Sequence, residues 1–188
     1  MDIIGDKMKD FFDRLEKELI STIRVDFNKL TELIKGECLY AVSLVTDSCF
    51  DSIYLGLSTE ESLLRKIDKY QEKREVSEKM KSYLRWTPAE WGYDNSDIPN
   101  SLLPKVSNIL RDKKMEVTSE FESMFYEVLE KVMRTLYQDG LFSNNIISSQ
   151  LTLFISISDD DRALEIENDS ARILNSLDVY EKFIKRFE

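Results

Sequence analysis

The chain contains no histidine, and among its 188 residues it has only five glycines, three prolines and two cysteines. The absence of histidine removes the side chain that most often serves as a general base and as a metal ligand. The shortage of glycine and proline leaves few tight turns, so the connections must join a small number of long elements. The two cysteines, Cys38 and Cys49, are too few for a secreted disulfide framework, and neither has a histidine to activate it as a nucleophile.

Several other features are also missing. No run of about 18 apolar residues is present, which argues against a membrane-spanning segment. The N-terminal residues lack a cationic start followed by an apolar block, so no signal peptide is evident. The glycine motifs of nucleotide-binding loops and of serine hydrolases do not occur. We therefore expect a cytoplasmic protein without a cofactor, and we predict no catalytic residue and no metal site.

Charge of one sign dominates what is present. Asp and Glu number 36 against 26 Lys and Arg, which gives a formal charge of −10. This balance disfavours nucleic acid, whose phosphates require clustered basic side chains, and it disfavours an anionic membrane surface. It permits a basic protein partner through long-range attraction. The plainer alternative is that the charge only keeps the protein in solution.

Apolar periodicity indicates a helix-rich protein. Hydrophobic residues make up 42% of the chain, enough for a sizeable core in a single domain covering residues 1–188. Apolar side chains recur at three- and four-residue steps through most of the sequence. Ser58 and Glu61 fit a capping box at the start of one helix. The predicted helices span residues 5–36 (with a break allowed at 24–26), 58–70, 101–113, 118–139, 161–174 and 178–187.

Three stretches are typical of strands. Residues 150–158, QLTLFISIS, alternate apolar and mixed positions, which predicts a central strand with helices against its Leu and Ile face. Residues 38–46 and 53–57 flank a turn-rich link and predict a hairpin. We expect an α+β fold, helix-rich, with a small and mainly antiparallel sheet covered by helices. A fourth edge strand is allowed near residues 83–87.

The sequence RWTPAEW, which begins at Arg85, interrupts every periodicity and contains both tryptophans. Arg85, Trp86, Glu90 and Trp91 fit two interpretations. They could form a recognition surface, because Trp and Arg are enriched at binding hot spots. They could instead plug the core, with Arg85 paired to Glu90 or to Asp159.

Carboxylates follow the predicted strand at 150–158. Asp159, Asp160 and Asp161 could bind Mg²⁺ or Ca²⁺ through oxygen ligands, together with Asp47 and Asp51 of the hairpin loop if the strand ends converge. The alternative is that the three consecutive aspartates cap the following helix and interact with its positive end.

Three stretches together resemble a known family. They are YAVSLVTDSCFDSIYLGLSTEESL from Tyr40, RWTPAEW from Arg85 and LFISISDDD from Leu153. In this order they resemble the bacterial domain of unknown function 4303 family, whose members are similar in length. The resemblance implies no activity, cofactor or catalytic residue.

Three functional hypotheses remain open. The preferred one is a non-enzymatic protein-binding module, immunity- or inhibitor-like, that holds a basic partner; the net charge and the acidic loop at Asp94 and Asp97 motivate it. The second is a hydrolase or transferase that uses carboxylates near Asp159, with or without a divalent metal. The third is a structural subunit of a larger assembly.

Overall fold

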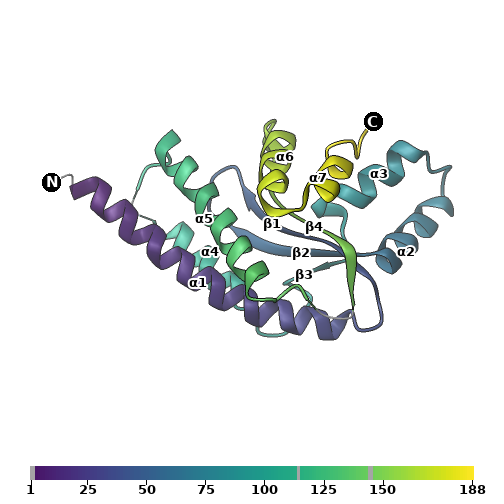
Figure 1. Cartoon of the computed structure of the whole chain (residues 1–188), viewed down its shortest axis with the longest axis horizontal. Helices are drawn as coiled ribbons and strands as arrows, with labels where there is room; N and C mark the ends of the chain where they lie inside the picture. The colour runs from purple at the N-terminus through teal and green to yellow at the C-terminus, as the bar shows by residue number, and fades with distance from the viewer. Residues whose placement is uncertain (1–2, 114, 144–145) are drawn as a thin grey trace.

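A four-stranded sheet separates two layers of helices (Figure 1). The computed structural model describes residues 3–113, 115–143 and 146–188. The strands are β1 (Leu39–Asp47), β2 (Ile53–Thr59), β3 (Tyr93–Asp94) and β4 (Ile147–Ser158). The helices are α1 (Ile3–Leu33), α2 (Glu60–Gln71), α3 (Glu78–Trp86), α4 (Leu103–Arg111), α5 (Ser119–Gln138), α6 (Ala163–Leu174) and α7 (Leu177–Phe183), with one 3-10 turn, η1 (Pro88–Glu90).

The sheet has the strand order β3-β2-β1-β4. β1 and β2 form the predicted antiparallel hairpin, and β3 is antiparallel to β2, but β4 runs parallel to β1. The α+β, helix-rich fold is therefore confirmed, whereas our prediction of a mainly antiparallel sheet was wrong, because the sheet is mixed. Antiparallel β2 already returns the chain to the starting end of β1, where Thr59 is opposite Leu39, and the long helical connection begins and finishes at that end, so that β4 runs parallel to β1.

β4 lies at an edge of the sheet and not at its centre, contrary to our prediction. Side chains from α6 and the residue after it occupy its open side. Asn175 accepts from the Leu153 N–H at 2.8 Å and donates to the Leu153 carbonyl at 2.7 Å. Ser170 Oγ accepts from the Ile155 N–H at 2.9 Å. These bonds replace those of a further strand and protect the edge from pairing with another chain.

The fourth strand is also misplaced in our prediction. Residues 83–87 belong to the end of α3 and the turn after it, and the edge strand is β3, paired with Gly56 and Leu57. Ser77 caps α3 by accepting from the Met80 N–H at 3.3 Å. The helix then ends before Pro88, because the residue preceding a proline disfavours helical backbone.

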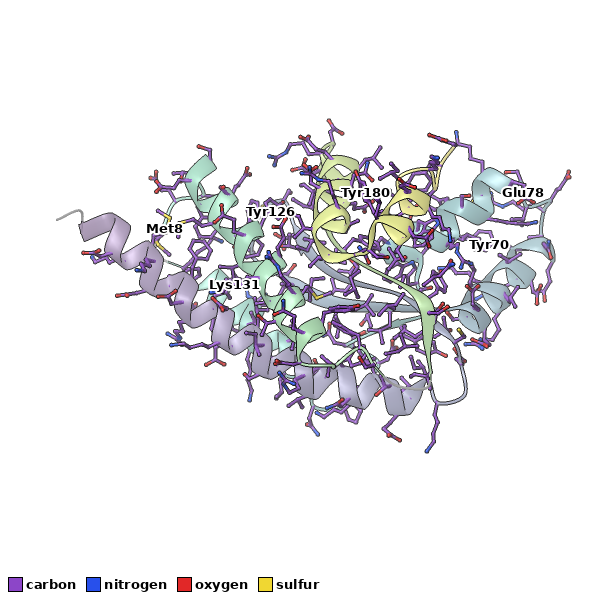
Figure 2. The ribbon with its side chains drawn as sticks, in the orientation of Figure 1. Met8, Tyr70, Glu78, Tyr126, Lys131 and Tyr180 are labelled. Atoms are coloured by element: carbon purple, nitrogen blue, oxygen red, sulfur yellow. The ribbon has the colours of Figure 1, made fainter. Side chains whose placement is uncertain are left out.

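Alternate strand residues enter different cores. One face of the sheet packs against α1, α4 and α5 in the main core through Val42, Leu44, Leu55, Leu57, Leu153 and Ile155, so the Leu and Ile face of β4 is covered by helices as predicted. Met8 extends this core along the side of α1 that faces α5 (Figure 2). The second face carries larger residues such as Phe154, Val45 and Tyr54, and between them several small or polar ones, namely Ser43, Gly56, Ser58, Thr152 and Ser156. This second face is the one on which hollows remain.

α1 is continuous through residues 24–26, so the break that we allowed there does not occur. Asp26 is fully buried because it caps another helix. Its carboxylate accepts from Ser101 Oγ at 2.7 Å and from the N–H groups of Leu102 and Leu103 at 2.9 and 3.0 Å. Leu102, the N-cap residue of α4, offers no side-chain cap of its own. Neither α1 nor any other helix of the described chain combines the length and apolarity needed to cross a membrane.

The cap of α2 lies one residue later than predicted. Thr59 Oγ1 accepts from the Ser62 N–H at 3.0 Å, and Ser62 Oγ accepts from the Thr59 N–H at 3.2 Å. Ser58 instead donates to the Tyr40 hydroxyl at 2.8 Å. The residue that we assigned to the cap therefore supports the second face of the sheet.

Candidate functional site

Trp86, the last residue of α3, lines two hollows over the second face of the sheet. The larger, which we call the strand-end groove, has a volume of about 490 Å³ and lies where β1 and β4 end. That volume is within the range of small-ligand and peptide-side-chain sites. The smaller, which we call the Arg85 pocket, has a volume of about 110 Å³ and lies near the start of both strands.

The strand-end groove has an apolar wall that faces solvent. Tyr83, Leu164 and Phe187 line it and are 44%, 51% and 45% exposed. The formal charges on its lining residues come from two carboxylates, Asp159 and Glu167, and no Lys or Arg of the described chain lines it. The groove is therefore apolar and acidic.

Asp159 carries the free charge of this groove. Its φ of 58° is left-handed, a conformation that costs a residue other than glycine on the order of 1 kcal/mol. Its exposed carboxylate makes no hydrogen bond or ion pair with another described residue. Such strained residues cluster at functional sites, where surrounding structure maintains them. Asp159 is the residue of the groove most available to a ligand.

The two aspartates after Asp159 are used differently. Asp160 accepts from the Arg162 N–H at 2.8 Å, and its hydrogen bonds with the Arg162 side chain hold the pKa of this carboxyl below its usual range. Asp161 lines a separate hollow beside α6. The N-cap position of α6 is Arg162, whose side chain makes no capping bond. Of the three predicted caps, only Asp160 orders the start of α6.

The second carboxylate of the groove, Glu167, is buried and fully partnered. It accepts from Ser156 Oγ at 2.7 Å and from the Arg186 guanidinium at 2.8 Å. Burial raises the pKa of Glu167. Since Arg186 precedes Phe187, this ion pair anchors the C-terminal segment beside the groove.

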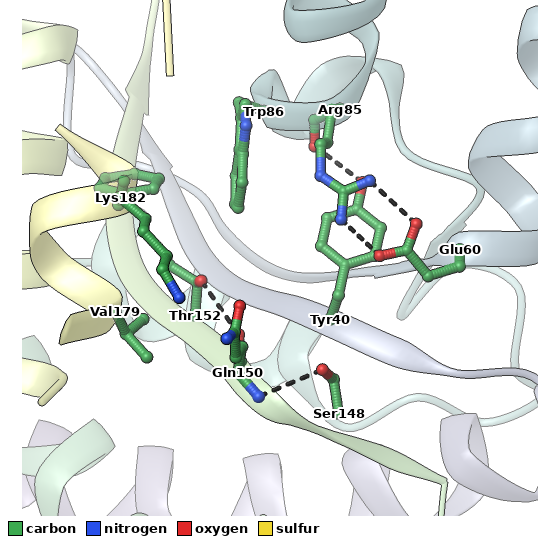
Figure 3. A pocket seen from close by; sticks show the side chains of 10 residues that line it. Tyr40, Glu60, Arg85, Trp86, Ser148, Gln150, Thr152, Val179 and Lys182 are labelled. Carbon is green, nitrogen blue, oxygen red and sulfur yellow. Dashed lines mark hydrogen bonds and ion pairs between the residues drawn. The ribbon is translucent and has the colours of Figure 1, made fainter. Parts of the chain in front are cut away.

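The Arg85 pocket is organised by a stacked arginine (Figure 3). The Arg85 guanidinium lies 4.1 Å from the centre of the Tyr40 ring, and both of its terminal nitrogens bond Glu60, one of them at 2.9 Å. The core-plug interpretation paired Arg85 with Glu90 or Asp159, and the structure pairs it instead with Glu60 at the start of α2. Burial raises the pKa of Tyr40 to about 12.

Trp91 and Glu90 support the site and line neither hollow. The Trp91 ring lies so close to Gly56 that a Cβ there would be 3.2 Å from the indole. It also meets Phe154 edge to face at 5.6 Å. Glu90 forms an ion pair with Lys66 at 2.7 Å. The core-plug interpretation therefore describes Trp91.

The predicted site residues separate into three groups. Trp86 and Asp159 share the strand-end groove, and Arg85 shares the Arg85 pocket with Trp86. Glu90 and Trp91 lie outside both.

Three residues of the groove were missed. Leu164 and Phe187 fall within the predicted helices 161–174 and 178–187, and Tyr83 falls within the edge strand allowed at 83–87; the sequence indicates no binding role for any of the three. The exposure of Tyr83 and Leu164 depends on which side of α3 and α6 meets the sheet, an orientation that apolar periodicity alone does not give, and Phe187 lies in the turns after α7, which ends at Phe183 and not at residue 187 as predicted.

The hairpin-loop carboxylates do not join the aspartates after β4. Asp47 is opposite Ser158 in the ladder, but its carboxylate turns back and accepts from the N–H groups of Cys49 and Asp51, each at 3.0 Å. Asp51 pairs with Lys113 at 2.5 Å. Across the described residues, no three Asp, Glu or Cys side chains are grouped so as to hold a metal ion.

These features define an α+β protein with a mixed four-stranded sheet and an open, acidic groove at the ends of its parallel strands. The chain belongs to the family described as Domain of unknown function (DUF4303), whose model matches residues 19–176. The resemblance proposed from the sequence is confirmed, and all three stretches that suggested it lie within the matched region. No curated protein and no solved structure shows significant similarity to the chain.

Proposed function

We propose that the protein is a cytoplasmic, non-enzymatic binding module that holds a basic partner protein, as an inhibitor or immunity protein does. The observation that carries the proposal is the unpartnered Asp159 carboxylate at an open apolar groove. The occupant is a partner segment that presents a Lys or Arg next to an aliphatic or aromatic side chain. The cation meets Asp159, and the apolar neighbour lies on Leu164 and Phe187.

Charge complementarity supports this occupant. Arg186 neutralises Glu167, so the Asp159 carboxylate is the free charge of the lining, and the chain as a whole has a charge of −10. Net negative charge accelerates encounter with a basic partner, and a local carboxylate then selects the register. The neighbouring Trp86 suits a hot spot, because tryptophan is enriched among residues that dominate binding energy.

The enzymatic alternative gains less support. Carboxylate catalysis needs two groups that converge on one substrate. Glu167 shares the groove with Asp159, but both of its oxygens are bonded to Ser156 and Arg186. Asp160 is bound to Arg162, and Asp161 lines another hollow. We therefore prefer a binding role for Asp159.

The proposal can be tested by selecting peptides that bind the protein from a random library displayed on phage. Wild-type protein is expected to enrich peptides with Lys or Arg beside Leu, Phe or Trp. The enriched peptides should bind Asp159→Asn about tenfold more weakly, because a charge-assisted hydrogen bond is worth about 1.5–3 kcal/mol. Fluorescence anisotropy of a labelled peptide measures the loss.

Asp161→Asn is the matched control, because it removes the same charge two positions away outside the groove. It should bind the selected peptides as wild type does. Enrichment of peptides without a cation, or equal weakening by both substitutions, would overturn the proposal. Asp159→Gly separates binding from folding, since glycine relieves the left-handed backbone and should preserve stability.

A further inference from the structure

The Arg85 pocket lies at an irregularity of the sheet. In the parallel ladder Leu39 is opposite Ile147, and the next pair is Ala41 with Thr152. Between these pairs β1 contributes only Tyr40, whereas β4 contributes residues 148–151. Such bulges recur next to functional sites, where they redirect side chains.

The bulge leaves hydrogen-bonding groups available at the pocket. The Gln150 N–H bonds Ser148 Oγ at 3.1 Å, within β4 itself. The Gln150 carboxamide lines the pocket and makes no hydrogen bond with a described residue. Figure 3 shows it on the same side of the pocket as Lys182 and across from Glu60.

The charge of the pocket is positive although the protein is acidic. Glu60 occupies both terminal nitrogens of Arg85, so that these two charges cancel. Lys182 remains, and its contact with Asp178 at 3.2 Å is an exposed pair on the surface of α7. Exposed pairs of this kind contribute little, so the Lys182 ammonium is available to a ligand.

The remaining wall is apolar and aromatic. Trp86 meets Phe183 edge to face at 5.2 Å, and Val179 lies beside them. A volume of about 110 Å³ corresponds to about four water molecules. The pocket thus joins one net positive charge and an amide donor to a small apolar surface.

We propose that the Arg85 pocket binds a small monocarboxylate. The carboxylate lies between the Lys182 ammonium and the Gln150 amide, and the short apolar tail lies against Trp86. A monoanion matches the one lysine that lines the pocket, whose exposed pair with Asp178 is weak, whereas a phosphate dianion would add a second negative charge facing Glu60. This site is separate from the strand-end groove, so its failure would leave the proposed function unaffected.

The proposal can be tested by titrating the protein with acetate, butyrate and phosphate. Binding is measured by calorimetry and by tryptophan fluorescence, since Trp86 is one of the chain's two tryptophans. Butyrate should saturate the pocket and bind about fifteenfold more tightly than acetate, because each buried methylene contributes about fourfold. Lys182→Met should weaken butyrate about tenfold. Lys185→Met, an exposed change outside the pocket, should leave it unchanged.

Three results would overturn the proposal. They are the absence of saturable butyrate binding, tighter binding of phosphate than of butyrate, and equal losses in the two lysine variants. Lys182 is exposed, so the substitution leaves the core intact and a loss of binding reports on the pocket.

Discussion

Asn175→Ala is expected to destabilise the protein by opening the edge of β4. The Asn175 carboxamide bonds both the N–H and the carbonyl of Leu153, and its amino group also donates to the Ala171 carbonyl at 2.8 Å. Leu153 is 1% exposed, so its backbone has little access to water. Alanine removes all three bonds and introduces no replacement.

The size of the loss follows from the N–H and the carbonyl of Leu153, which are both left without a partner. A buried donor or acceptor left without a partner costs about 1–3 kcal/mol. Once the carboxamide is removed, water can enter the space that it leaves, which favours the lower part of that range for each group, and the sum is about 2–4 kcal/mol. The free energy of unfolding of a domain is typically about 5–15 kcal/mol, so this loss is a large fraction of the total stability.

Urea unfolding measures the loss, and two variants bracket it. Asn175→Asp keeps the acceptor for the Leu153 N–H but places a carboxylate oxygen against the Leu153 and Ala171 carbonyls, so it should lose at least as much stability as alanine. Ser176→Ala removes an adjacent exposed hydroxyl that caps nothing, and should stay within about 0.5 kcal/mol of wild type. The reasoning would be refuted if Asn175→Ala lost no more unfolding free energy than Ser176→Ala does. An open edge should also pair with other chains, so the absence of concentration-dependent association in light scattering would refute it as well.

Two further predictions concern buried or bonded carboxylates. Asp26→Ala should cost about 3–5 kcal/mol in urea unfolding, because it leaves the N–H groups of Leu102 and Leu103 without a cap; a loss under about 1 kcal/mol would contradict the cap. Burial alone would raise the pKa of Asp47, but donors of the hairpin loop such as the Asp51 N–H outweigh it and lower the pKa. The stabilisation from Asp47 is therefore present above its unfolded pKa and is lost as pH falls through the lower, folded pKa, so Asp47→Asn should flatten the stability profile at acid pH, from the ordinary carboxyl pKa downward. Parallel profiles for the two proteins would exclude this role.

Local patterns predicted the elements well. The alternation in QLTLFISIS places Leu153 and Ile155 in the main core, and the hairpin strands pair as expected. The periodicity of residues 118–139 corresponds to α5, and Gly140 adopts the positive φ of 75° that a helix end favours. Each of these features depends on neighbours within a few residues, which is the range over which periodicity and turn chemistry act.

Features that depend on distant residues were missed. Asp26 interrupts an apolar pattern because it caps α4, a role visible only when α1 and α4 are side by side. Asn175 resembles an ordinary helix end, yet its partner is Leu153. The parallel direction of β4 is set by the path of the helices between it and β2, and that path leaves no local trace in either strand.

In the candidate site, too, the residues with a local sequence signal were predicted and those that depend on distant residues were not. Trp86 and Asp159 were found because an unusual composition and a charged strand end are local signals. Leu164 was missed because an exposed apolar residue on a helix has the same sequence appearance as a buried one, and Phe187 was missed because the predicted helix extends past Phe183, where α7 ends. The groove that these two residues border exists because side chains of the second face of the sheet, such as Ser156 and Ser158, are too short to fill the space beneath α6. The groove therefore originates in the short residues of the strands as much as in the large residues around it, and lengthening those strand residues should close it.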